Sequence, residues 1–231
     1  MSGSTIVPTV ERLRQAFDGG RTRPVEWRLA QLQEVARMMR DHEADFGEAL
    51  RLDLGKSAFE AMLTELSFVE AEAKYAIRHL DTWMRPVRVR TPLMVQPGRS
   101  HIQPEPKGVV LIIAPWNYPL SMVMAPLVGA IAAGNCVVMK PSEVTRHTSS
   151  TLANILPRYL DPDAFAVVEG GIPETTELLE QRFDHILYTG NERVARIVMG
   201  AAAKHLTPVT LELGGKSPCL IDKSADIEVA A

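Results

Sequence analysis

A glutamate stands between two leucines in residues 211–218, which read LELGGKSP. A charge among apolar side chains costs free energy, so this position suggests that the Glu212 carboxylate has a task. Desolvation raises the pKa of a carboxyl group, and a glutamate with a raised pKa is suited to act as a general base. Glu212 is therefore a candidate catalytic base. The alternative is a structural glutamate paired with a cation.

An asparagine lies in a short segment bounded by two prolines, residues 115–119 (PWNYP). Proline fixes its own φ angle, so Pro115 and Pro119 restrict the backbone on both sides of Asn117. A side-chain amide held in this way can donate a hydrogen bond to an oxygen that gains negative charge during a reaction. Asn117 is therefore a candidate oxyanion donor. The alternative is a turn asparagine that satisfies local backbone groups.

A lysine and a glutamate follow the apolar run at 136–139, in the order Lys140, Pro141, Ser142, Glu143. An ammonium group and a carboxylate at the end of a strand can hydrogen-bond to ribose hydroxyls. The alternative is a solvated charge pair at the start of a helix.

Two glycine-containing turns complete the candidate site. Residues 169–171 (EGG) allow a ligand to approach the backbone closely, because glycine has no Cβ. Residues 189–191 (TGN) open a predicted helix, whose N-terminal N–H groups would suit a pyrophosphate. Neither turn is the GxGxxG dinucleotide fingerprint, so each is weak evidence alone.

The segments that must position these residues alternate between strand and helix from Gly108 onward. Apolar strands without polar alternation are buried on both faces, and repeated strand–helix units predict a Rossmann-like, doubly wound parallel sheet. Such sheets bind ligands at the carboxyl ends of their strands. The predicted strands are 109–114, 136–139, 164–168 and 185–188, with further candidates at 209–211 and 217–221. The predicted helices are 120–133, 145–160, 174–182 and 192–204.

The first part of the chain has a different pattern. Residues 1–86 contain apolar side chains at helical spacing and are predicted to form helices that pack on the cofactor domain, residues 108–231. Residues 87–107 contain two short alternating segments on either side of Pro97-Gly98, which predicts a β-hairpin. We expect this hairpin to bridge domains or subunits; the alternative is an irregular linker.

Composition excludes several other classes of protein. Hydrophobic residues make up 46% of the 231 residues, charged residues make up 23%, and the net charge is −3. These values are typical of a soluble globular protein and give no basis for nucleic-acid binding. The two cysteines, Cys136 and Cys219, lie in apolar runs without a Cys/His cluster, which indicates a reduced, cytoplasmic protein with no metal site. Residues 1–10 do not have the pattern of a signal peptide.

Taken together, these motifs resemble the aldehyde dehydrogenase superfamily. PWNYP, MKPSE, YTGN and LELGGKSP occur in the family's order and at compatible spacing, and the joint match is far more specific than any one motif. The run AAAKHLTPVTLELGGKSP is most similar to the class 3 branch, which acts on fatty and aromatic aldehydes. The resemblance extends from the first helices to Ala231.

The resemblance implies an NAD(P)-dependent oxidation of aldehydes by way of a thiohemiacetal, hydride transfer and thioester hydrolysis. It implies that Asn117 donates to the oxyanion and that Glu212 activates water. It also implies a homodimer in the full-length enzyme. The implied cofactor-binding residues, for either NAD or NADP, are Trp116, Lys140, Ser142, Glu143, Gly170, Thr189, Gly190, Asn191, Leu213 and Gly214.

Two features depart from the family pattern. The helix after Gly190 usually carries a second glycine where this chain has Ala195, whose methyl group would crowd the helix or the pyrophosphate. The family's nucleophilic cysteine is also missing, because only Cys219 follows Glu212, and Cys219 is expected to pack inside a strand.

The end of the chain agrees with a missing catalytic domain. Asp226 is a typical N-cap, and residues 227–231 would form a single helical turn, which is not stable alone. We therefore expect a truncated, inactive N-terminal portion of an aldehyde dehydrogenase. The alternatives are a non-catalytic dinucleotide-binding module and one half of a split enzyme. A related acyl-phosphate or acyl-CoA reductase is disfavoured, because such enzymes do not need the glutamate of LELGGKSP.

Overall fold

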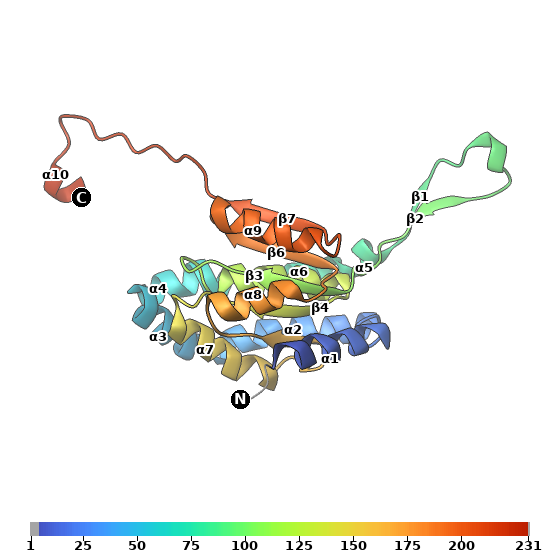
Figure 1. The fold of residues 1–231 in the computed structure, drawn as a ribbon, viewed down its shortest axis with the longest axis horizontal. Helices are drawn as coiled ribbons and strands as arrows, with labels where there is room; N and C mark the ends of the chain where they lie inside the picture. Colours follow the sequence, from blue (N-terminus) through green and yellow to red (C-terminus); the bar gives the residue numbers. More distant parts are fainter. Residues whose placement is uncertain (1–4, 231) are drawn as a thin grey trace.

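The computed structural model describes residues 5–230, so residues 1–4 of the N-terminal segment and Ala231 lie outside the described residues. Its centre is a five-stranded parallel sheet with the order β5-β4-β3-β6-β7 (Figure 1). The strands are β3 (Val109–Ile113), β4 (Cys136–Lys140), β5 (Phe165–Val167), β6 (His185–Gly190) and β7 (Val209–Leu213). The predicted parallel sheet is confirmed.

Four helices connect the strands: α6 (Ser121–Ala133), α7 (Arg146–Ile155), α8 (Ile172–Glu180) and α9 (Glu192–Ala203). The chain moves outward from β3 to β5 through α6 and α7, then returns past β3 to β7 through α8 and α9. Crossovers between parallel strands are right-handed, so reversing direction puts α8 and α9 on the face opposite α6 and α7. The sheet is therefore doubly wound.

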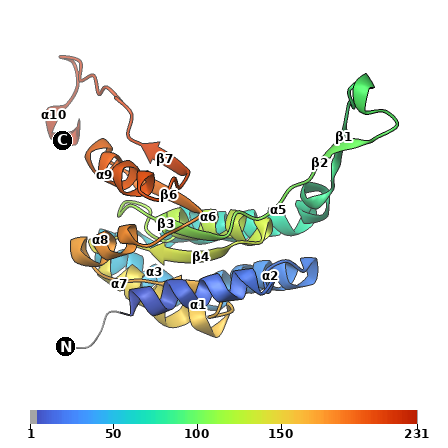
Figure 2. The ribbon, with the colours of Figure 1, turned by 45° about the vertical axis from the view of Figure 1, so that its right-hand side comes forward.

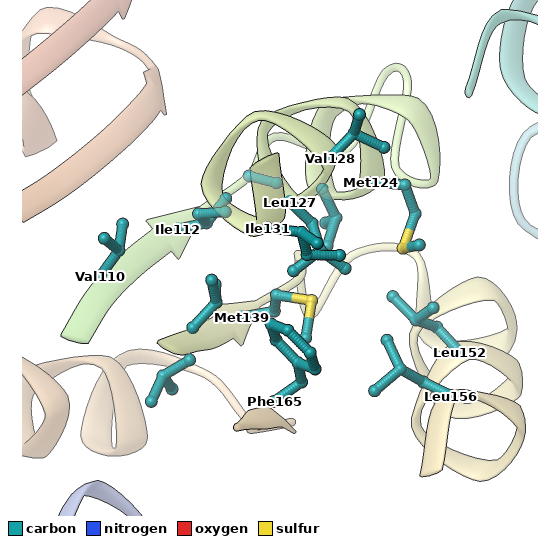
Figure 3. Packing of buried hydrophobic residues seen from close by; sticks show 14 of the residues in the cluster. Val110, Ile112, Met124, Leu127, Val128, Ile131, Met139, Leu152, Leu156 and Phe165 are labelled. Atoms are coloured by element: carbon teal, nitrogen blue, oxygen red, sulfur yellow. The ribbon is translucent and has the colours of Figure 1, made fainter. Parts of the chain in front are cut away.

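The core lies between α6 and the strands that it crosses. Every residue of β3 and β4 is buried. Figure 3 shows Leu127 and Ile131 of α6 directed toward Met139 and Phe165, with Leu152 beside them. Continuous burial explains why these two strands are apolar throughout instead of alternating.

The N-terminal residues form helices, as predicted. They are α1 (Ile6–Asp18), α2 (Val25–Asp41), α3 (Glu43–Leu54), α4 (Ala58–Ala61) and α5 (Ser67–Met84), with a π-helical turn, Met62–Leu66, before α5. Helix α1 contacts β3, β4 and α8, whereas α2 and α5 contact each other and α6. The N-terminal helices therefore complete the covering of the sheet.

The predicted hairpin is also confirmed. β1 (Val87–Val89) pairs antiparallel with β2 (Ser100–Ile102), and the 3-10 turn Leu93–Val95 lies between them. Both views show the hairpin projecting from the body of the protein (Figures 1 and 2).

The strand predicted at 217–221 is wrong. No strand forms after β7 within the described residues, and the chain from 214 runs away from the sheet in both views. Cys219 is therefore exposed instead of packed inside a strand. A strand needs a hydrogen-bonding neighbour, and an apolar run without one does not form a ladder.

The predicted ends of two helices can be compared with the structure. The helix predicted at 145–160 ends as an α-helix at Ile155 and continues as a 3-10 turn, Leu156–Arg158, because Pro157 has no N–H to donate. The predicted N-cap is confirmed, since Asp226 Oδ1 accepts hydrogen bonds from the backbone N of Glu228 at 3.0 Å and of Val229 at 3.4 Å. The helix that follows is α10 (Ile227–Ala230).

Within residues 5–230, no helix is both long and apolar enough to cross a membrane. The same residues contain no group of three or more His, Cys, Asp or Glu side chains that could hold a metal ion.

The central strand should dominate stability. Leu111 on β3 is fully buried, so Leu111→Ala removes apolar contacts and leaves a cavity. We expect the free energy of unfolding to fall by about 3 kcal/mol, measured by urea unfolding. Leu220→Ala is the matched control, because Leu220 is 94% exposed, and it should change stability by less than about 0.5 kcal/mol. Equal losses in the two variants would contradict this assignment of the core.

Candidate functional site

The register of the sheet brings the candidate residues together at the C-terminal ends of the strands, which we call the carboxyl edge. Ile113 is level with Lys140 on one side and with Tyr188 on the other. Gly190 is level with Leu213 on β7. The loops that follow β3, β4, β5 and β6 therefore open at the same edge, which is where parallel sheets bind ligands.

Lys140 is the buried cation of this edge. Its side chain is 2% exposed, its Nζ donates to the carbonyl oxygen of Pro141 at 2.7 Å, and Glu143 Oε2 lies at 3.7 Å. Burial lowers the pKa of Lys140, and Glu143 offsets part of that effect. An ammonium group has three N–H donors, and hydrogen bonds within the described residues occupy one of them. Lys140 is thus placed to donate to a ligand.

The loop after Lys140 is held by one internal hydrogen bond and by an anchor where it joins α7. Ser142 Oγ accepts a hydrogen bond from the backbone N of Val144 at 3.3 Å, while the Glu143 side chain is 54% exposed. At the start of α7, Asp53 accepts from the backbone N of Thr148 at 2.7 Å. Burial alone would raise the pKa of Asp53, but hydrogen bonds from Thr148 and His147 outweigh it and lower the pKa. Helix α3 therefore anchors this loop through Asp53.

The glycine turn after β5 needs its glycine. Gly170 has φ +121°, a conformation that L side chains rarely adopt, and a Cβ there would lie 2.5 Å from the Glu174 carboxyl group. The Glu174 carboxylate accepts a hydrogen bond from the backbone N of Gly171 at 2.7 Å. Hydrogen bonds from the backbone of Glu174 itself and of Gly171 lower the pKa of this carboxyl group. Glycine at position 170 therefore makes room for the Glu174 carboxylate, which holds the turn through the backbone N of Gly171.

The TGN turn is divided between strand and helix. Thr189 and Gly190 end β6, and Asn191 is the N-cap of α9, where its side chain accepts from the backbone N of Val194 at 3.0 Å. A Cβ on Gly190 would lie 2.3 Å from Tyr188 Oη, so this position requires glycine. Ala195 is 2% exposed, and α9 continues through it without interruption. Its methyl group therefore does not distort the helix.

The Asn117 loop presents its side chains to solvent. Asn117 is exposed and Trp116 is 54% exposed. The backbone carbonyl oxygen of Asn117 accepts a hydrogen bond from Lys56 Nζ at 3.0 Å. The loop is thus fixed through its backbone, which leaves the Asn117 amide available.

The expected desolvation of Glu212 is wrong for the described residues. Glu212 is exposed, because β7 is an edge strand and the next segment leaves the sheet. Leu213 is 44% exposed and Gly214 is exposed beside it. Glu212 is separated from Lys140 by three strand spacings, since β3 and β6 lie between β4 and β7, which is roughly 14 Å. A ligand that contacts both residues must therefore be long.

Sequence analysis did not identify four residues that hold these loops: Lys56, Asp53, Glu174, and Glu65, whose carboxylate accepts hydrogen bonds from the backbone N of Leu120 and Ser121. Glu174 had a recognisable signal, because it lies three residues after the helix N-cap Gly171. Glu65 also had one, since it is a charged residue with leucines nearby, at 63 and 66, in a helical segment. No local signal marks Asp53 or Lys56, whose partners lie far away in the sequence.

Comparison with known proteins identifies the relatives of this chain. The sequence profile of the aldehyde dehydrogenase family matches residues 3–231. Aldehyde dehydrogenase family 3 member B1 of Bos taurus is 54% identical over 223 residues, which cover 96% of this chain and 48% of the relative. The dimeric NADP-preferring aldehyde dehydrogenase of Canis lupus familiaris is 51% identical, over 98% of this chain and 50% of the relative.

The fold agrees with that similarity. The substrate-bound AldH of Staphylococcus aureus superposes with a TM-score of 0.91 at 40% identity, covering 98% of this chain and 50% of that structure. The chain therefore spans about half the length of the curated relatives that it matches.

The buried ammonium group of Lys140 should cost stability. Because burial lowers its pKa, the charged form is less favourable in the folded than in the unfolded state. We expect Lys140→Met to raise the free energy of unfolding at pH 7 by about 1 kcal/mol, measured by urea unfolding.

The stability difference between Lys140→Met and wild type should also depend on pH. Between the folded-state pKa of Lys140 and its unfolded value of about 10.4, only the unfolded state holds the proton, so the free energy of unfolding of the wild type increases as pH rises. The advantage of Lys140→Met should therefore shrink as pH approaches 10.4. A variant much less stable than wild type at pH 7 would instead show that Lys140 is a structural partner of Glu143.

Proposed function

The chain belongs to the aldehyde dehydrogenase family, and we propose that it forms the nucleotide-binding half of an NAD(P)-dependent enzyme that oxidises aldehydes to carboxylic acids. Enzymes of this family use NAD or NADP; one relative is named NADP-preferring, and one solved neighbour holds NADP+. The observation that supports the proposal best is the buried Lys140 at the carboxyl edge of the sheet, with N–H donors to spare.

The donor set of this edge fits a dinucleotide. Lys140 and the exposed Glu143 supply a cation and a carboxylate that can together hold ribose hydroxyls. Gly170 and Gly190 let Glu174 and Tyr188 pack closely against the turns that follow β5 and β6, which shapes the loops beside these groups. The first turn of α9 would offer backbone N–H groups to a pyrophosphate.

The loop after β3 and strand β7 would act on the aldehyde carbon that reacts. The cofactor, when bound, accepts a hydride. We propose that Asn117 donates to the oxygen of the aldehyde as it gains charge, since its loop is fixed through the backbone. Glu212 would activate water. Because Glu212 is exposed, its desolvation would have to come from residues beyond 5–230.

The nucleophile would also come from outside these residues. Burial raises the pKa of the Cys136 thiol to about 12, which leaves almost no thiolate at neutral pH. Cys219 is exposed and lies between β7 and α10, in a segment that forms no strand. We therefore propose that neither cysteine attacks the aldehyde. The alternative is a non-catalytic dinucleotide-binding module, or one half of a split enzyme that pairs with another chain.

The hairpin β1–β2 is our proposed contact with a second copy or with a catalytic domain that corresponds to the part of the relatives that this chain does not cover. Its tip exposes Leu93 by 87% and Met94 by 97%, an unfavourable arrangement in an isolated chain. One relative is named dimeric, which agrees with a homodimer of the full-length enzyme. The division into helices 1–86, hairpin 87–107 and cofactor domain 108–231 remains our proposal, as does the cytoplasmic location.

Cofactor binding should depend on the adenosine side of the site. We expect Lys140→Ala to weaken binding of AMP, ADP and NAD alike, by about tenfold or more, because a charge-assisted hydrogen bond to the ribose is lost. Glu212→Gln should change the affinity for these ligands less than twofold. Isothermal titration calorimetry measures all of these affinities.

Lys204→Ala is the matched control for this titration. Lys204 is an exposed lysine at the C-terminal end of α9, on the opposite edge of the sheet, so its replacement should leave affinity unchanged. If folded wild-type protein binds neither ADP nor NAD at millimolar concentration, the proposed half-site is refuted.

Catalysis should need residues outside this chain. A polypeptide limited to residues 1–231 is expected to give no measurable turnover of benzaldehyde or hexanal with NAD or NADP, because neither cysteine is placed as a nucleophile. Absorbance of the reduced cofactor measures turnover. Activity that Cys219→Ser abolishes would assign the nucleophile to Cys219 and contradict our proposal.

A further inference from the structure

We propose that the buried ion pair Lys56–Glu65 is a positioning device for the Asn117 loop, and this inference rests on the proposed function. The pair lies outside the cofactor-binding residues, on the N-terminal helical segment. Lys56 is in the turn between α3 and α4, and Glu65 is in the π-helical turn before α5. Both side chains reach the chain on either side of Pro119, between Asn117 and the start of α6.

Glu65 fixes the C-terminal end of the loop, where it joins α6. Its side chain is fully buried, and Oε2 accepts hydrogen bonds from the backbone N of Leu120 at 3.0 Å and of Ser121 at 2.8 Å. These N–H groups are at the start of α6, where a carboxylate is favoured by the helix dipole. Glu65 therefore determines where the loop joins α6.

Lys56 fixes the loop at Asn117 and Tyr118. Its Nζ lies 2.6 Å from Glu65 Oε1 and donates to the carbonyl oxygen of Asn117 at 3.0 Å. The same ammonium group lies 4.0 Å from the centre of the Tyr118 ring, within cation–π range. One cation thus contacts both Asn117 and its neighbour, while the Asn117 side chain is exposed.

The helix that carries Glu65 is widened at this point. Residues Met62–Leu66 are π-helical, and the backbone N of Ser67 donates to the carbonyl oxygen of Met62, five residues earlier. A π-turn inserts one residue into an α-helix and changes the direction in which its side chains point. Such turns are frequent at functional sites, and here the turn contains the residue that holds the loop.

Stability alone is a weak reason for this arrangement. A buried ion pair roughly breaks even against apolar residues of similar volume, because desolvation offsets the attraction between the charges. The contacts instead have a geometric effect, since they hold the backbone of a loop whose amide must meet a developing oxyanion within a fraction of an ångström. We assign the pair to positioning for that reason.

The test separates positioning from folding with three variants of the full-length enzyme that contains these residues. Lys56→Met removes the donor to Asn117 and leaves the Glu65 charge buried without its partner. Lys56→Met/Glu65→Gln removes both charges and keeps a carbonyl acceptor for the start of α6. Lys74→Met is the control, because Lys74 pairs with Glu70 at 2.7 Å on the surface of α5, away from the loop.

We expect the double variant to recover most of the stability lost in Lys56→Met, while its kcat stays about 10- to 100-fold below wild type. The KM for the cofactor should not change, because Lys140 is untouched. Hydrogen exchange in residues 114–121 should be about tenfold faster in both Lys56 variants. Lys74→Met should match wild type in every measurement.

A double variant with wild-type kcat and wild-type exchange would overturn the inference, and so would a kcat that recovers in step with stability. If the wild-type enzyme oxidises no aldehyde, the proposed function fails, whereas hydrogen exchange in residues 114–121 still decides whether the pair holds the loop.

Discussion

The parallel register of the sheet is the constraint on which the rest of this structure depends. Because Ile113 is level with both Lys140 and Tyr188, the loops after three strands open at the same height. Ile113 is 27 positions from Lys140 and 75 positions from Tyr188 along the chain, and the burial of the apolar strands brings these residues together. The buried core, together with the N-terminal helices that cover it, therefore determines which residues meet at the carboxyl edge.

The two buried ammonium groups, of Lys56 and Lys140, differ in how fully other groups of the protein satisfy their charge. Lys56 has a carboxylate at 2.6 Å and a backbone carbonyl at 3.0 Å, so its charge is satisfied within the protein. Lys140 has a backbone carbonyl at 2.7 Å, but its carboxylate lies at 3.7 Å. The contrast favours a loop-holding role for Lys56 and a ligand-binding role for Lys140.

The sequence predicted what local pattern determines and missed what topology determines. Continuous apolar runs identified β3 and β4, and Pro97-Gly98 identified the hairpin. The exposure of Glu212 was not predictable from its two neighbouring leucines, because it follows from the position of β7 at the edge of the sheet. The contact of Lys56 with Asn117 joins residues 61 positions apart, so no spacing rule reveals it. An apolar run at 217–221 has strand composition but no neighbour to pair with.

A crystal structure with bound ADP tests the central claim most directly. We expect the nucleotide at the C-terminal ends of the strands, with its ribose within hydrogen-bond distance of Lys140 Nζ and its phosphates at the first turn of α9. Density for the nucleotide at the N-terminal ends of the strands, or against the β1–β2 hairpin, would contradict the proposed half-site even if the measured affinity were high.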